Sequence, residues 1–148
     1  MRRYLVNSTY CIYLLDLKAL YFDQSVSTLR EVVEEVMHEK TVEVEATLVP
    51  FKKASVLVRG NFLSSTDLAL LQTSKATDCI LVTDDQKLIS AAHENQIHAL
   101  DTPHFIHRLL IEGKWTEEKA IDILDQLKPI YNRGYVIDKV IKDIKNWR

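Results

Sequence analysis

Hydrophobic residues along this 148-residue chain alternate between short apolar runs and longer segments with helical spacing. The runs at 2–6 (RRYLV) and 79–83 (CILVT) are rich in β-branched and aromatic or apolar side chains and predict strands. In segment 29–40 (LREVVEEVMHEK), apolar side chains recur at the three- and four-residue intervals of an amphipathic helix. The pattern therefore mixes both periodicities from the start of the chain.

The remaining segments continue this alternation. Ser27 or Thr28 is expected to cap the 29–40 helix, and the SSTD sequence at 64–67 has the form of a second capped helix start. Segment 41–50 alternates like a strand but could also continue a helix until Pro50, and both readings stay open. Further strands are predicted at 20–22, 55–59 and 97–100, a turn at 60–61, and further helices from Tyr10 onward and at 64–75, 86–94, 103–111, 117–127 and 136–147.

Strands that alternate with helices predict an α/β fold around a parallel sheet, with extra helices at the C-terminal end. The length fits one domain on the usual scale of roughly 100–200 residues per domain. We place its core at about 2–110 and a helical extension at about 112–148. The apolar runs are too short to span a bilayer and no signal-peptide pattern begins the chain, so a cytoplasmic protein is expected.

Polar side chains are concentrated where the predicted strands end and the following helices begin. Asn7 follows the first strand, Asp67 lies in the first turn of its helix, and Asp84 and Asp85 follow CILVT. Because the carboxyl ends of parallel strands share one edge of a sheet, these side chains are expected to converge. Clustered carboxylates favour a hard cation such as Mg²⁺ or Mn²⁺. Asp and Asn are also common helix caps, and on position alone capping is the simpler reading of each residue.

Several motifs together resemble the PIN domain, the nuclease fold of VapC-type toxins and of RNA-processing endonucleases. The segment LSSTDLALLQTSKATDCILVTDDQKL has an L-S-x-x-D helix start and an apolar strand that ends in T-D-D. YLVNST occupies the place of the family's opening strand, and STLREVVEEVM is similar to its V-x-x-E-[IV] helix. The resemblance covers roughly residues 2–107 and implies a three-layer α/β/α sandwich with a central parallel sheet.

The resemblance implies a site as well. Glu35, Asp67 and the pair Asp84/Asp85 would be both the catalytic residues and the metal ligands, and the sequence does not say which member of the pair faces the metal. Other residues expected at the active edge are Asn7, Ser8 and Thr83. Active members of the family normally have Asp at the end of the first strand. Here Asn7 keeps a carbonyl ligand but removes one negative charge, which weakens Mg²⁺ binding.

The function implied is that of an Mg²⁺- or Mn²⁺-dependent endoribonuclease, either a VapC-like toxin or an RNA-processing nuclease. Its partners would be RNA and either an antitoxin protein or a ribosomal particle, and a homodimer is expected. Asn7 supports a different alternative, in which the chain is a catalytically inactive PIN-like module that binds RNA or protein. Both alternatives remain open at the level of sequence.

Basic residues and histidines give weaker indications of function than the acidic motifs do. The net charge of −2 excludes RNA binding by bulk charge alone, so the expected RNA contacts are local, at Lys52, Lys53 and Arg59. His104 and His107 lie three residues apart but lack the carboxylate of an HExxH zinc motif. The sequence contains no glycine-rich phosphate loop and no G-x-S-x-G motif, which argues against nucleotide-cofactor and serine-hydrolase chemistry.

Overall fold

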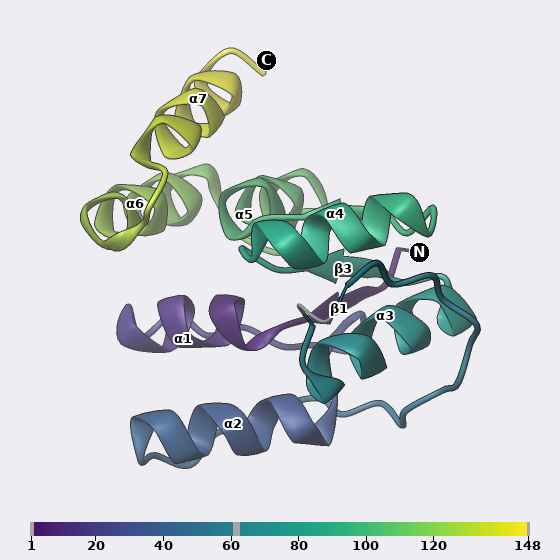
Figure 1. Cartoon of the computed structure of the whole chain (residues 1–148). Coiled ribbons are helices and arrows are strands. Elements are labelled where there is room, and N and C mark those ends of the chain that lie inside the picture. Colours follow the sequence, from purple (N-terminus) through teal and green to yellow (C-terminus); the bar gives the residue numbers. More distant parts are fainter. Residues whose placement is uncertain (1, 61–62, 148) are drawn as a thin grey trace.

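A computed structural model of the chain describes residues 2–60 and 63–147. The described residues form a four-stranded sheet in the order β2-β1-β3-β4, and all three neighbouring pairs are parallel. Helices surround this sheet and continue beyond it (Figure 1). The strands are β1 (Tyr4–Val6), β2 (Val26–Ser27), β3 (Ile80–Val82) and β4 (Ala99–Leu100). The helices are α1 (Ser8–Asp16), α2 (Arg30–Lys40), α3 (Ser65–Thr77), α4 (Gln86–Glu94), α5 (Thr102–Ile111), α6 (Glu117–Leu127), the 3₁₀ helix η1 (Lys128–Ile130) and α7 (Gly134–Lys145).

The strand order places helices on both faces of the sheet. The chain moves outward from β1 to β2 in one direction and from β3 to β4 in the other. Because both crossovers are expected to be right-handed, α1 and α4 fall on opposite faces. The Phe105 ring of α5 contacts the rings of Tyr4 and Tyr10, with centroids 5.0 and 5.3 Å away, so α5 shares the face of α1. The predicted α/β class with a parallel sheet is confirmed, and the arrangement is consistent with three α/β/α layers.

Two of the helix starts that the sequence predicted from polar caps are present, those of α3 and α4. Ser64 Oγ accepts a hydrogen bond of 3.1 Å from the backbone N–H of Asp67, and Asp85 Oδ1 accepts one of 2.9 Å from that of Lys87. Helices α4 and α6 have the bounds expected from the sequence. These caps accept hydrogen bonds from N–H groups in the first helical turn, which have no carbonyl partner within the helix.

The predicted strand at 20–22 and the predicted cap at Ser27 or Thr28 are wrong. The chain makes a turn around Asp23, whose Oδ1 accepts from the backbone N–H groups of Ser25 and Val26, at 2.7 and 2.8 Å. The strand begins only after this turn, at β2. Thr28 Oγ1 donates to the carbonyl of Val6 at 2.6 Å and therefore secures the sheet instead of capping α2.

The predicted strand at 55–59 is also wrong, although its alternation is real. Val56 and Val58 are half-buried while their neighbours are exposed, as in an extended chain. The backbone of Leu57 is paired with the side chain of Asn95: Oδ1 accepts from the Leu57 N–H at 2.7 Å and Nδ2 donates to its carbonyl at 2.8 Å. The Asn95 amide thus replaces a neighbouring strand, which a side-chain pattern does not reveal.

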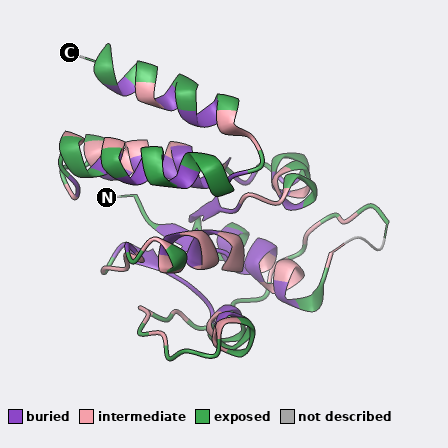
Figure 2. Ribbon diagram, turned by 90° about the vertical axis from the view of Figure 1, so that its left-hand side faces the viewer, coloured by how far each residue is buried: buried purple, intermediate pink, exposed green. Residues whose placement is uncertain are grey.

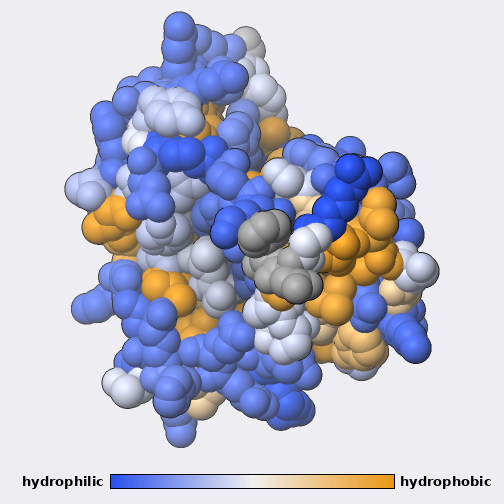
Figure 3. Space-filling model, in the orientation of Figure 1, coloured by the Kyte–Doolittle hydropathy of each residue, from blue (hydrophilic) through white to orange (hydrophobic). Residues whose placement is uncertain are grey.

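The undecided segment 41–50 is neither a helix nor a strand. Its contact with the sheet is an isolated parallel bridge between Leu48 and Thr28. Gly60, at the predicted turn, has a φ of 79°, and Asn61 lies outside the described residues. The irregular segment continues to Gly60, and Phe51 and Leu57 are exposed along it. Hydrophobic atoms gather on the right side of Figure 3, the side along which this stretch runs in Figure 1.

The C-terminal helices pack on α5 and on one another, and the faces that they turn inward are buried (Figure 2). Buried Val136, Ile137, Val140 and Ile144 of α7 belong to the same hydrophobic cluster as the strands. A polar contact also joins the two regions, since the Tyr131 hydroxyl donates to Asp84 Oδ1 at 2.5 Å. Among the described residues, no helix combines the length and the apolar character needed to cross a bilayer.

Candidate active site at the carboxyl edge of the sheet

Five of the predicted site residues follow directly on the carboxyl ends of β1 and β3, namely Asn7, Ser8, Thr83, Asp84 and Asp85. These central strands are adjacent, but the chain leaves them in opposite directions, toward β2 and toward β4. Such a switch point opens a crevice outside the strand ends, where α/β proteins bind their ligands. The backbone N–H of Asn7 donates to the carbonyl of Val82 at 2.8 Å, which fixes the two strand ends together. The sequence prediction that they share an edge is confirmed.

Asn7 is buried in this edge, at 4% exposure, and all of its side-chain groups are engaged. Oδ1 accepts from the backbone N–H of Ser8 at 2.7 Å and caps α1, while Nδ2 donates to Thr83 Oγ1 at 2.9 Å. Thr83 Oγ1 also accepts from the backbone N–H of Asp85 at 3.2 Å. Asn7 and Thr83 therefore form a neutral polar link that holds the start of the Asp85 turn.

Asp84 is hydrogen-bonded to three other segments of the chain. Its Oδ1 accepts from the backbone N–H of Thr102 at 2.8 Å and from the Tyr131 hydroxyl at 2.5 Å, and its Oδ2 accepts from Thr102 Oγ1 at 2.6 Å. Its own N–H donates to Thr9 Oγ1 at 3.0 Å. Burial raises the pKa of the Asp84 carboxyl, although the Thr102 and Tyr131 hydrogen bonds oppose that rise. The Asp84 side chain thus ties α5 and the C-terminal helices to β3.

Asp85 and Glu35 each lie close enough to Asp67 for their negative charges to act on it. Burial raises the pKa of Asp67, hydrogen bonds from Ser64 oppose the shift, and the negative charges of Asp85 and Glu35 add to it. These residues come from the start of α4, the first turn of α3 and the middle of α2. Three elements distant in sequence therefore place negative charge in one region. Asp67 and Asp85 also take part in helix caps, so a capping role is compatible with a role in the candidate site.

The donor chemistry of these three carboxylates fits a hard divalent cation, because carboxylate oxygens in mutual repulsion are stabilised by one. Asp67 and Asp85 are half-buried, whereas Glu35 is exposed on α2. Among residues 2–60 and 63–147, no three His, Cys, Asp or Glu side chains are already gathered at metal-binding distance. Binding of a cation would therefore require these side chains to move closer together.

The three basic residues expected to contact RNA lie along the irregular segment before α3, and all are exposed. The backbone N–H of Lys52 donates to Thr73 Oγ1 at 3.1 Å, which holds this segment on α3. Arg59 Nε lies 3.6 Å from a carboxylate oxygen of Glu94 on α4. The segment is therefore fixed beside α3 and α4, and the side chains of Lys52 and Lys53 extend from it into solvent.

A second group of polar side chains lies after β4 at the same edge of the sheet, and the sequence did not predict it. Asp101, 8% exposed, caps α5 and accepts from His104 Nδ1 at 2.6 Å, and its other oxygen lies 3.4 Å from an Arg133 guanidinium nitrogen. The hydrogen bond to Asp101 raises the pKa of His104. The sequence contained a signal for this group, because Asp101 follows the predicted strand 97–100 as Asp84 follows CILVT.

A pocket of about 350 Å³ opens beside Asp85, between α1, the start of α4 and the turn after η1. The rings of Tyr13 and Tyr131 meet there with centroids 5.3 Å apart and planes inclined by 54°. The Arg133 guanidinium lies 6.0 Å from the Tyr131 ring centroid. The complete lining is Thr9, Tyr13, Asp84, Asp85, Gln86, Tyr131, Asn132 and Arg133.

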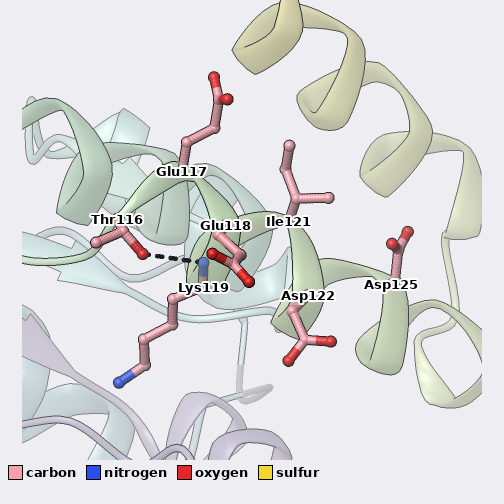
Figure 4. Close-up of a pocket in the computed structure, with 7 residues that line it drawn as sticks. All are labelled: Thr116, Glu117, Glu118, Lys119, Ile121, Asp122 and Asp125. Carbon is pink, nitrogen blue, oxygen red and sulfur yellow. Dashed lines mark hydrogen bonds between the residues drawn. The ribbon is translucent and has the colours of Figure 1, made fainter.

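A larger hollow, about 580 Å³, lies along α6 (Figure 4). Acidic side chains dominate it, including exposed Glu118, Asp122 and Asp125. The contact drawn there is the N-cap of α6, in which Thr116 Oγ1 accepts from the backbone N–H of Lys119 at 3.1 Å. These are features of a solvated helix face, so the sheet edge remains the better candidate site.

Comparison with known proteins does not add to this description. No protein-family model, no curated protein and no solved structure matches the chain.

Proposed function

We propose that the chain is a PIN-like ribonuclease that depends on Mg²⁺ or Mn²⁺ and cleaves RNA at the crevice between β1 and β3. The observation that carries the proposal is the half-buried Asp67, on which the negative charges of Asp85 and Glu35 act, beside the switch point of a parallel sheet. Such repulsion costs free energy in the free protein and is relieved when a cation binds. The T-D-D and L-S-x-x-D motifs supply two of the three carboxylates.

Glu35, Asp67 and Asp85 would hold the cation, with the buried Asn7 at the floor of the crevice. A bound divalent cation supplies charge stabilisation at a phosphodiester and lowers the pKa of a bound water. The chain itself contributes the N-terminal ends of α1 and α4, which meet at this edge. Their partial positive charge favours the phosphate of an RNA strand.

Of the adjacent aspartates, Asp85 is the better candidate to face the cation. Both oxygens of Asp84 already accept hydrogen bonds from Thr102 and Tyr131, and a metal would have to compete with them. Asp85 Oδ1 accepts a hydrogen bond from the backbone N–H of Lys87 in the same helix turn, and Asp85 is less enclosed by contacts from other elements. We therefore assign Asp84 to holding the C-terminal helices and Asp85 to the cation.

The second candidate function is a noncatalytic PIN-like module that binds RNA or protein. The observation in its favour is Asn7, whose amide donates to Thr83 and accepts from Ser8, so that a neutral group fills the first acidic position. A crevice with one carboxylate fewer binds Mg²⁺ more weakly. In this case the fold would be retained for binding, and the cation would be dispensable.

Calorimetric titration with Mn²⁺, together with cleavage of a labelled single-stranded RNA, separates the two functions. Asp67→Asn and Glu35→Gln each remove one charge from the proposed site, whereas Glu34→Gln removes the neighbouring exposed charge on α2 and is the matched control. For the nuclease, both Mn²⁺ binding and cleavage are lost in Asp67→Asn and Glu35→Gln and kept in Glu34→Gln. If the wild type binds no Mn²⁺ and cleaves no RNA, the nuclease proposal is wrong and the noncatalytic module stands.

The physiological setting is a separate proposal. A toxin would arrest growth when expressed alone and be neutralised by a small protein encoded beside it. An RNA-processing nuclease would instead sediment with ribosomal particles. Expression of the wild type and of Asp67→Asn in the same host distinguishes these cases, because toxicity that depends on the site is abolished by the substitution.

A further inference from the structure

We infer that the pocket beside Asp85 binds one unpaired base of an RNA strand. This inference deepens the proposed function and rests on it, since it names how the substrate would be held next to the acidic crevice. The connection between the two sites is Asp85, which lines the pocket and whose charge acts on Asp67. A base in the pocket would thus place the adjoining phosphate beside the carboxylates.

The shape of the pocket suits a single base. Its volume of about 350 Å³ lies at the lower end of the roughly 300–1,000 Å³ typical of ligand pockets. The paired rings of Tyr13 and Tyr131 supply an aromatic wall. Unpaired bases stack on such walls in most proteins that bind single-stranded RNA, because every base has a π-face.

The polar groups of the pocket also favour a base over a phosphate. Asp84 and Asp85 contribute carboxylates to the lining, and these repel an anion. The exposed side-chain amides of Gln86 and Asn132 offer both donors and acceptors to the edge of a base. Tyr131 is buried and its hydroxyl donates to Asp84, so the half-buried Tyr13 ring offers the aromatic face to a ligand.

Arg133 has the place expected of a group that contacts the backbone of the strand. It lines the pocket, with its guanidinium 6.0 Å from the Tyr131 ring centroid and 3.4 Å from Asp101 Oδ2. A second, smaller hollow is lined by Arg133, Gln86 and His104, among other residues. The two hollows share Gln86 and Arg133, so a strand could pass from one to the other.

The test measures RNA binding without cleavage. A fluorescein-labelled single-stranded RNA is titrated in EDTA at low salt and followed by fluorescence anisotropy. Tyr13→Leu is compared with Phe51→Leu, an exposed aromatic residue on the irregular segment. Removal of one stacking ring is expected to weaken binding about 5- to 100-fold in Tyr13→Leu, while Phe51→Leu binds like the wild type.

Two further measurements guard against a folding defect. Asn132→Ala alters an exposed residue of the pocket and is expected to weaken binding several-fold with an unchanged melting temperature. RNA that contains 4-thiouridine is then photocrosslinked to the wild type, and the adduct is expected on the peptide with Tyr13 or the peptide with Tyr131. Wild-type affinity in both variants, or adducts confined to other peptides, would overturn the inference.

The outcomes also separate this inference from the proposed function. If the wild type never cleaves RNA but binding depends on Tyr13 and the crosslinks map to the pocket, the base site stands and the nuclease fails. If cleavage depends on Asp67 but Tyr13→Leu binds normally, the nuclease stands and the base site fails. Asp67→Asn should abolish cleavage while the Tyr13 crosslink persists.

Discussion

The contact between Tyr131 and Asp84 joins the C-terminal helices to the sheet edge, and Tyr131→Phe should weaken this junction. The substitution keeps the ring beside Tyr13 and removes the hydroxyl that donates to Asp84 Oδ1 at 2.5 Å. Hydrogen bonds to charged groups contribute about 1.5–3 kcal/mol, more than neutral ones. Asp84 keeps its two bonds from Thr102, so the loss is confined to one bond. The free energy of unfolding should therefore fall by about 1.5–3 kcal/mol.

Urea unfolding followed by circular dichroism measures this change, and thermal unfolding should show a melting temperature lower by about 3–12 °C. The control is Tyr135→Phe, which removes a hydroxyl from a side chain that is 71% exposed on α7. Its unfolding free energy should change by less than about 0.5 kcal/mol. Equal stability of the wild type and Tyr131→Phe would refute the reasoning, because the Asp84 hydrogen bonds would then not hold the extension to the core.

Three further predictions follow from buried or coupled groups. Phe105→Ala should cost about 3–5 kcal/mol in urea unfolding, because the ring is fully buried, whereas exposed Phe51→Ala should cost little. The hydrogen bond between His104 and Asp101 raises the pKa of His104 above its usual 6.5. Burial alone would raise the pKa of Asp101, but the hydrogen bond from His104 outweighs burial and lowers that pKa below its usual 3.8. The stabilisation by this pair is therefore complete between about pH 3.8 and 6.5, and it is lost at higher pH as His104 deprotonates and at lower pH as Asp101 protonates. His104→Gln should lower the melting temperature most in that window. A difference in melting temperature that grew above pH 8 would contradict this. Asn7→Asp should tighten Mn²⁺ binding in calorimetry and lower the metal-free melting temperature, because it adds a buried charge at the crevice; unchanged affinity would argue against a cation beside residue 7.

Local signals in the sequence determined much of the secondary structure. Helical spacing and short polar caps act over a few residues, so Ser64 and Asp85 marked their helix starts correctly. The apolar runs at β1 and β3 and the alternation of strands with helices were sufficient for a parallel α/β sheet, and this placed Asn7, Asp84 and Asp85 at one edge.

Tertiary structure decided what local pattern does not encode. Segment 55–59 alternates like a strand, but a strand needs a partner, and here the backbone of Leu57 is paired by a single side chain, Asn95. The adjacent aspartates are equivalent in sequence, yet Tyr131, 47 residues away, occupies Asp84 and leaves Asp85 at the crevice. Side chains form hydrogen bonds and charge pairs with the groups that the fold brings close in space. These groups lie far apart in the sequence, so local periodicity does not reveal them.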